Sequence, residues 1–392
     1  MRKLTIAAML MLAAVYCGAQ DFSSILSEIE RNNITLKSFR SKAEADKLDY
    51  RTGLTPDDPE VEMGYLWETK DPEGGHRIDL GVSQSFDFPT VYYWKKKISD
   101  GQCTAAEIEY AIGRKNVLLE ARQTCIELVF NNAVCTILAE SKDNSERVFK
   151  GMEQRYAHGD IGIVSLNEAR LSMMNASRAY RHAEIERQAT LDALKLLNGG
   201  KSVSFEYDTF PMMILPEDFE QWYSDACLSN SEIGLLSKNL ELAESSVRLA
   251  QSEWLPKFTI GYTSERVPGS TLQGISGGIS IPLWSGKGKV KAAKARQQAS
   301  ADILEADRTS FMNSMKSKHD RLKSLYELCE EYRALLEDTE SAELLLKALE
   351  EGEINFGQYA TSMQSWYSSQ MELLELERDC HVLLSELEAF KQ

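Results

Sequence analysis

Histidine, cysteine and methionine are the side chains of this sequence best suited to hold a metal or take part in catalysis. No HExxH helix, no closely spaced cysteine pair and no nucleophile elbow occurs, so neither a zinc enzyme nor a serine hydrolase is indicated. The pairs Met173–Met174 and Met212–Met213 would suit copper, but adjacent methionines more often fill a core. The sequence therefore predicts no enzyme, no metal site and no cofactor. The five histidines are scattered: His76, His158, His182, His319 and His381.

Seven cysteines are present, and six of them follow residue 19. An even number permits disulfides in an exported chain but does not require them. Because most of the six lie in helical stretches, we expect buried free thiols. The six are Cys103, Cys125, Cys135, Cys227, Cys329 and Cys380.

The first 19 residues read MRKLTIAAMLMLAAVYCGA, with two basic residues, an apolar run and small residues at the end. This order is typical of a secretory signal peptide, residues 1–19, cleaved after Ala19. Cys17 offers the alternative of a lipoprotein signal, although the bulky Tyr16 precedes it. No later stretch has the ~20 consecutive apolar residues of a membrane helix, and the sequence therefore predicts an exported protein.

The composition excludes one class of partner. The formal net charge is −16, and 27% of the residues are charged. Binding to phosphate backbones needs a local excess of Lys and Arg, so no nucleic acid is expected as a partner. With 392 residues, of which 43% are hydrophobic, the chain is long enough to bury a sizeable core.

A short pattern of glycine, acid and isoleucine occurs twice, in HGDIG around Gly159 and in EGEIN around Gly352. The two glycines are 193 residues apart, and the same offset relates GVSQSFDFP, ending at Pro89, to GISGGISIP, ending at Pro282. PEVEMGY and PKFTIGY match at an offset of 197, which indicates four extra residues in the loop of the first copy. We therefore expect an internal duplication.

Each repeat is expected to run helix, β-hairpin, long helix, glycine turn and returning helix. The first repeat covers residues 20–197, with its hairpin at 59–89 and its long helix at 90–158. A linker at 198–215 joins it to the second repeat at 216–392, with its hairpin at 256–282 and its long helix at 283–351.

The predicted strands alternate strictly between apolar side chains on one face and small or polar side chains on the other. One interpretation is a sheet whose apolar face packs on a soluble core. The alternative is a bilayer, because strands of about 10 to 12 residues cross it at a tilt and glycine with serine would suit a wet interior. Aromatic residues such as Trp67, Trp254 and Trp284 lie at or beyond strand ends. The apolar, lipid-facing set is Val61, Met63, Tyr65, Leu80, Val82, Phe86, Phe258, Ile260, Tyr262, Ile275, Ile279 and Ile281.

The two long helices would each be about 100 Å long at 1.5 Å per residue. A helix of that length must lie along other helices, as in a coiled coil. Gly159 and Gly352 mark the tips where each chain turns back, because glycine adopts the dihedral angles of such turns. We expect Asp160 and Glu353 to stand at the start of the returning helices, next to their positive ends.

In this order of elements, in the prolines that close each second strand, FDFPT and SIPLW, and in the paired tips, the sequence resembles the TolC family of outer-membrane efflux and secretion channels. The resemblance covers about residues 21–390. It implies a mainly α fold with a small β part: long antiparallel helical hairpins forming an α-barrel, and two β-hairpins contributing four strands per chain to a trimeric 12-stranded β-barrel. Four strands alone cannot close a barrel, so the chains must pool strands.

The resemblance implies a passive trimeric exit duct in the outer membrane of a Gram-negative bacterium, extending into the periplasm. Its partners would be a periplasmic adaptor protein, an inner-membrane pump and outer-membrane lipid. Relatives narrow their lumen with acidic residues after the tip. The corresponding positions here are Ser165 with Glu168, and Gln358 with Thr361, which makes Glu168 and Gln358 the candidates for a constriction. The residues expected to dock the adaptor are Gly159, Asp160, Ile161, Gly352, Glu353 and Ile354.

Two alternatives to a tripartite efflux duct stay open from the sequence. The first is the outer-membrane duct of a type I protein secretion system, because the duct itself does not reveal its cargo. The second is a periplasmic coiled-coil adaptor protein, although an adaptor would flank one helical hairpin with soluble β-domains, whereas this chain has two hairpins and two pairs of strands.

Overall fold

The computed structural model describes residues 22–67, 75–215, 218–284, 286–337 and 342–390. The expected signal peptide at 1–19 and most of the first hairpin loop lie outside these ranges. The chain divides into two compact units. A helical unit comprises Met1–Lys37, Gly113–Ser229 and Met312–Gln392, and a sheet unit comprises Ser38–Ile112 and Asn230–Phe311. Both units take segments from both predicted repeats, and the repeat boundaries stay a prediction.

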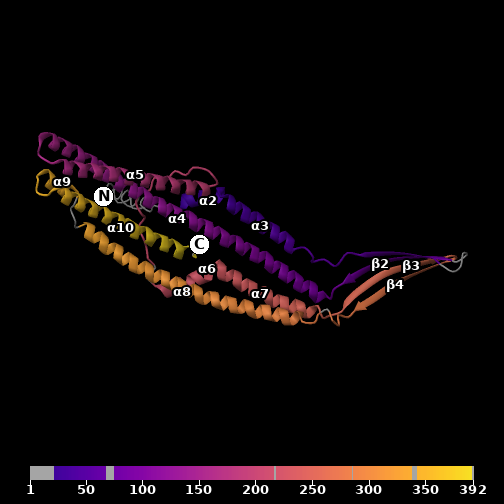
Figure 1. The fold of residues 1–392 in the computed structure, drawn as a ribbon. Coiled ribbons are helices and arrows are strands. Elements are labelled where there is room, and N and C mark those ends of the chain that lie inside the picture. The colour runs from indigo at the N-terminus through magenta and orange to yellow at the C-terminus, as the bar shows by residue number, and fades with distance from the viewer. Residues whose placement is uncertain (1–21, 68–74, 216–217, 285, 338–341, 391–392) are drawn as a thin grey trace, which may run out of the picture. The chain divides into compact units, whose positions relative to one another are not determined.

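The helical unit consists of long antiparallel helices. In Figure 1, α5 runs back beside α4, and α10 runs back beside α8. Among the described residues, none of the helices is long and apolar enough to cross a membrane. The helices of this unit are α2 (Ser23–Asn32), α5 (Ile163–Leu197), α6 (Phe219–Ser229), α9 (Ala342–Glu350) and α10 (Phe356–Glu388), with the later parts of α4 (Pro89–His158) and α8 (Lys289–Glu337).

Helix α4 confirms the first long helix predicted from the sequence. It has 70 residues and begins at Pro89, a position where proline is favoured because its missing N–H would have no helical partner. The second long helix was expected over 283–351 and starts later, at Lys289. A turn precedes it, in which the Lys287 amide donates to the Trp284 carbonyl at 3.1 Å and Gly288 adopts φ +86°. The described residues of the expected span form two helices, α8 and α9, and residues 338–341 fall outside the described ranges.

The core of the helical unit lies where α2, α4 and α5 meet. Ile29, Leu128 and Leu194 are fully enclosed there, and the linker covers them with Phe205 and Tyr207. The linker has no helix or strand of its own, and the Asn132 side chain fixes it by donating to the Tyr207 carbonyl at 2.7 Å. The predicted linker is thus an extended segment packed on the helices.

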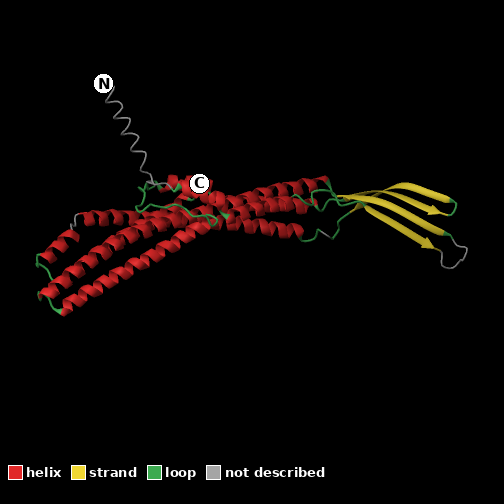
Figure 2. Cartoon of the chain, turned by 90° about the horizontal axis from the view of Figure 1, so that it is seen from above, coloured by secondary structure: helices red, strands yellow, loops and turns green. Residues whose placement is uncertain are grey.

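The sheet unit contains one antiparallel sheet in the order β1-β2-β3-β4, drawn in yellow in Figure 2. The two predicted hairpins adjoin through β2 and β3, so the four strands form a single layer. The strands are β1 (Glu60–Trp67), β2 (His76–Phe86), β3 (Lys257–Val267) and β4 (Ser270–Ser280). The unit also contains α7 (Ser231–Ser252) and parts of α3 (Ile34–Tyr50), α4 and α8.

The observed fold is mainly helical with a small antiparallel sheet, which confirms the predicted fold class. Strand β1 has 8 described residues and is followed directly by residues 68–74, which lie outside the described ranges. One detail differs. Strand β4 ends at Ser280, so Ile281, expected in the apolar face, follows the strand instead; Pro282 comes next and cannot donate to a strand ladder.

Candidate functional site

One face of the sheet is apolar across all four strands. Directly opposite residues share a face, and the register joins Val61 to Val82, Val82 to Tyr262, and Tyr262 to Ile275. A second row joins Phe86, which is half-buried, to Phe258 and Ile279. The predicted apolar set is therefore brought together by the structure. Its members with large exposed side chains are Val61, Met63, Tyr65, Leu80, Val82, Phe258, Ile260, Tyr262, Ile275 and Ile279.

The other face carries small and polar side chains. Across the strands, Ser83 lies opposite Gly261, and Gly261 lies opposite Ser276. A Cβ added at Gly261 would come within 2.6 Å of the Ser276 Oγ atom, so this row has no room for a larger residue. Arg77 lies on the same face and pairs with Asp79 at 2.8 Å and with Glu265 at 3.2 Å. The two faces thus differ in polarity, although Leu66 and Leu272 lie on the polar face and Gln84 and Arg266 lie on the apolar one.

Strands β1 and β4 form the two edges of the sheet. Within the part of the chain that the structure describes, each pairs with one neighbour only. An edge presents unpaired N–H and C=O groups that can template another strand. The apolar side chains on these edges are highly exposed, with 70% for Val61 and 86% for Ile275. In a single chain, the two edge strands therefore leave backbone N–H and C=O groups without a strand partner among the described residues, and the apolar face is left exposed.

The first tip is a Schellman motif at the end of α4. The Gly159 amide donates to the Tyr156 carbonyl at 3.0 Å, and the Asp160 amide donates to the Arg155 carbonyl at 2.9 Å. Gly159 adopts φ +85°, which is the left-handed conformation that this motif requires and that glycine accepts at low cost. The turn satisfies two carbonyls that the end of the helix would otherwise leave unpaired.

The second tip repeats this motif bond for bond. The Gly352 amide donates to the Leu349 carbonyl at 3.3 Å, and the Glu353 amide donates to the Ala348 carbonyl at 2.9 Å. Gly352 adopts φ +77°. Every donor and acceptor lies 193 positions after its counterpart in the first tip. The local structure of the two glycine turns is therefore as duplicated as their sequence.

The acidic residues stand at a different place from the one expected. Helix α5 begins at Ile163 after Gly162, and α10 begins at Phe356 after Asn355, and neither has an acid in its first turn. Asp160 and Glu353 belong to the turn instead, two residues before each cap. The expectation that each acid stands at the start of the returning helix was wrong, because the cap residue, Gly162 or Asn355, lies between the acid and the first helical residue.

The two tips share one apolar cluster. Met152, Leu166, Phe356 and Tyr359 form part of its buried centre, and the tip isoleucines pack against it half-buried. The structure thus brings together the predicted tip residues from both repeats. Gly159, Asp160, Gly352 and Glu353 are exposed, whereas Ile161 and Ile354 anchor the turns to the cluster.

The two constriction candidates are both exposed. Gln358 is part of a capping box: its Oε1 accepts the Asn355 amide at 3.0 Å, and the Asn355 Oδ1 accepts the Gln358 amide at 2.9 Å. Sequence reasoning missed this role of Gln358, although the spacing of Asn355 and Gln358 is the capping-box signal. Glu168 lies in the first turns of α5, and its part in a constriction stays a prediction.

Another group that sequence reasoning missed stands at the end of β2. Asp87 pairs with Lys257 at 2.8 Å and with Lys95 at 3.1 Å. Burial alone would raise the pKa of Asp87, but the hydrogen bonds from the two lysines outweigh it and lower that pKa below the ordinary value. The cluster ties β3 and the start of α4 to the end of β2.

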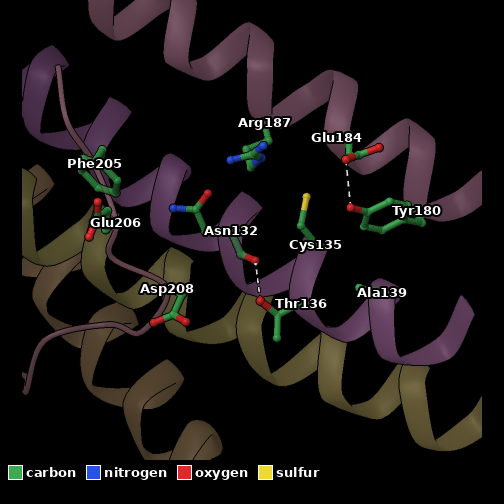
Figure 3. Close-up of a pocket in the computed structure, with 10 residues that line it drawn as sticks. All are labelled: Asn132, Cys135, Thr136, Ala139, Tyr180, Glu184, Arg187, Phe205, Glu206 and Asp208. Atoms are coloured by element: carbon green, nitrogen blue, oxygen red, sulfur yellow. Dashed lines mark hydrogen bonds between the residues drawn. The ribbon is translucent and has the colours of Figure 1, made fainter. Parts of the chain in front are cut away.

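A polar cavity of about 400 Å³ lies in the helical unit between α4, α5 and the linker (Figure 3). Tyr180 donates to Glu184 at 2.8 Å along its edge, and Arg187 and Asp208 also line it. In the described ranges, no three His, Cys, Asp or Glu side chains form a group that could hold a metal ion. The cavity marks where the linker crosses the two helices, and none of its charged residues was a candidate from the sequence.

No protein-family model matches the sequence, and no curated protein matches it. Solved structures do match. The CmeC outer membrane channel of Campylobacter jejuni is 16% identical, with a TM-score of 0.74, covering 95% of this chain and 86% of that one. The outer membrane protein VceC of Vibrio cholerae is 15% identical, with a TM-score of 0.75 and coverages of 94% and 96%. A membrane protein of Pseudomonas aeruginosa is 15% identical, with a TM-score of 0.80 and coverages of 95% and 91%.

These similarities define the fold, since nearly the whole of each chain superposes. The architecture is that of outer-membrane channel proteins built from long helices and a four-stranded sheet. More specifically, the chain has the TolC-family fold, and the resemblance predicted from its sequence is confirmed at the level of the fold.

Proposed function

We propose that the chain is the outer-membrane duct of an efflux system and that three copies pool their strands into one barrel. The observation that carries this proposal is the exposed apolar face, which continues across all four strands of a sheet with two open edges. In lipid an open edge is too costly, so a spanning sheet must close. Four strands fall short of the eight in the smallest membrane barrels.

The dimensions of the strands support a membrane location. Strands β2, β3 and β4 each have 11 residues, which at about 3.3 Å per residue gives about 36 Å. At a tilt of about 45° such a strand spans about 26 Å, close to the apolar band of about 25 Å in membrane barrels. Trp67 at the end of β1 and Trp284 beyond β4 are 69% and 81% exposed, as interfacial aromatic side chains would be.

The polar face would line the lumen. Its small glycine and serine side chains would leave the lumen open, and Arg77 offsets one of the two negative charges of Asp79 and Glu265. Conduction through such a duct requires no reaction, which agrees with the absence of a predicted catalytic motif in the sequence.

The tips are the proposed docking surface for a periplasmic adaptor. Two equivalent Schellman turns present Asp160 and Glu353 to solvent from one cluster. An adaptor whose own tips carry basic or amide side chains would meet two similar sites per chain. Charge reversal at both acids, by Asp160→Lys with Glu353→Lys, should abolish adaptor binding while the duct still assembles. Glu331→Lys, at an exposed position inside α8 and outside the turns, serves as the control.

The decisive test is the state of the purified protein. Membranes of expressing cells would be fractionated, the protein extracted in mild detergent, and the mass of the complex measured by light scattering corrected for detergent. An outer-membrane particle of three chains is expected. A soluble monomer would refute the duct and leave the apolar face to be explained by another partner.

A further inference from the structure

A cavity of about 550 Å³ lies in the sheet unit, between α4, α7 and α8. Three basic side chains line it, one from each helix: Lys97 of α4, Arg248 of α7 and Lys294 of α8. All three are exposed, and within the described part of the chain none of them forms an ion pair. In a chain with a formal net charge of −16, the cavity is thus a local concentration of unpaired positive charge.

Two acidic residues of α7, Glu241 and Glu244, line the same cavity. Glu241 already has a partner, because the Lys238 ammonium lies 2.8 Å from its carboxylate, and Lys97 acts on it only from a greater distance. Glu244 is left to balance the three basic side chains of the lining. An anionic ligand would therefore meet two positive charges in excess.

The cavity lies on the side that continues the apolar face of the sheet. Lys257, on the polar face of β3, pairs with Asp87 at 2.8 Å, and Lys95 of α4 pairs with the same carboxylate at 3.1 Å. Lys95 therefore points to the side of the polar face. Successive residues of an α-helix are about 100° apart, so Lys97 points about 200° away from Lys95. Tyr93, one turn before Lys97 and 61% exposed, shares its side.

We propose that this cavity binds the phosphate headgroup of an anionic phospholipid, in the membrane leaflet next to the helices. The inference rests on the proposed function, because only a sheet that spans lipid brings the cavity to the level of the headgroups. Trp94 marks that level as an interfacial aromatic residue would. It lines the cavity one turn before Lys97, whose Nζ atom lies 5.3 Å from the centre of the Trp94 ring.

The three basic residues lie at similar heights along their helices. At a rise of 1.5 Å per residue, Lys97 lies about 12 Å after the start of α4, and Lys294 lies about 8 Å after the start of α8. Arg248 lies about 6 Å before the end of α7. Each of these helix ends leads into or out of a strand (Figure 1), so the three charges gather next to the sheet.

The chemistry of the lining suits a lipid phosphate. The guanidinium group of Arg248 can hold two phosphate oxygens at once, and the two lysines add point charges. Long basic side chains also lay their apolar stems on apolar surface while the charged ends stay among the headgroups. Trp94 and the buried Val247 give the cavity an apolar wall for the glycerol part of the lipid. Its volume falls in the range of small-molecule sites.

The first test is native mass spectrometry of the full chain, purified from membranes in mild detergent. The protein is incubated with phosphatidylglycerol, which is anionic, or with phosphatidylcholine of the same acyl chains, which is zwitterionic. Saturable binding of one phosphatidylglycerol per chain is expected, with weaker binding of phosphatidylcholine. Equal binding of the two lipids would overturn the proposal, and so would displacement of phosphatidylglycerol by inorganic phosphate, which would indicate a site for the free ion.

The second test removes the three charges, by Lys97→Gln with Arg248→Gln and Lys294→Gln. Each basic residue near an anionic lipid contributes about fivefold in affinity, so binding of phosphatidylglycerol should weaken about 100-fold. The charge-conserving pair Lys97→Arg with Lys294→Arg should keep the wild-type affinity. The matched control removes three exposed basic side chains of the helical unit and should also bind normally: Lys150→Gln, Arg181→Gln and Lys323→Gln. Equal losses in the cavity variant and in this control would refute a specific site.

The same spectra separate this inference from the proposed duct, because they report the mass of the assembly together with its bound lipid. A particle of three chains without a preference for phosphatidylglycerol would overturn the headgroup site and leave the duct standing. The absence of any three-chain particle would overturn the duct and this inference with it.

Discussion

Arginine placed at Ile275 provides the sharpest test of which face of the sheet meets lipid. Ile275 is the middle residue of β4, is 86% exposed and pairs with Tyr262. At the midplane of a bilayer, arginine on the lipid face of a barrel costs about 2–4 kcal/mol. On a surface in contact with water, the same change stays within about 0.5 kcal/mol. Ile275→Arg should therefore lower the folding equilibrium constant of each chain about 30- to 900-fold if the face is in lipid.

The neighbouring residue offers a matched control. Gly274 lies opposite Thr263 on the polar face, and a Cβ added there meets nothing within 4 Å. Gly274→Arg introduces the same charge one residue away, and we expect a change of at most about 0.5 kcal/mol, because substitutions facing a lumen are tolerated.

The assay is urea unfolding of protein refolded into lipid vesicles, followed by tryptophan fluorescence and by the heat-dependent migration of the oligomer on gels. The expected outcome is a large loss for Ile275→Arg and little change for Gly274→Arg. Equal effects of the two variants, or an unchanged Ile275→Arg, would refute the assignment of the apolar face to lipid.

Three further predictions concern the helical unit. Gly352→Ala should lower the free energy of unfolding by about 1–2 kcal/mol, because the φ of +77° at Gly352 disfavours any Cβ. Gly151→Ala inside α4 should raise the free energy of unfolding by up to about 1 kcal/mol, because alanine is the better helix former. Denaturant titration measures both changes, and two changes of the same sign would contradict the reasoning. Asn355→Ala removes the capping box and should cost about 1 kcal/mol, visible as faster amide exchange in the first turn of α10 but not at its far end. Burial lowers the pKa of His381 from 6.5 to about 4, so the unfolded chain takes up a proton that the folded chain refuses; stability should fall as the pH drops from 6.5 to about 4, and an unchanged profile in His381→Phe would contradict this origin.

The parts of the fold that follow a local period could be predicted from the sequence. Strand alternation has a period of two, so Val82 and Ile275 could be assigned to one face without knowing any partner strand. The tips could be located because glycine is needed where φ is positive, at Gly159 and Gly352. Helix α4 could be predicted over its full length because no proline interrupts it after Pro89.

Features that depend on distant or competing contacts could not be predicted. The pairing of β2 with β3 joins residues such as Val82 and Tyr262, and two hairpins with the same alternation do not specify which strands adjoin. The predicted start of α8 was too early, although the two glycines of the stretch WSGKGK are a sequence signal for a turn. The structure gives a reason for one of them, because a Cβ at Gly286 would come within 2.6 Å of the Trp254 ring.

The edge strands β1 and β4 also bear on how the protein reaches its final state. Each is left with one neighbour within the described residues, so in the proposed assembly the last hydrogen bonds of the sheet form between chains. The sheet is then completed only when the chains associate, and the rate of that association rises steeply with protein concentration. Until that association, newly exported chains expose strand edges that favour aggregation. The yield of folded protein should therefore depend on how quickly three copies meet near the membrane.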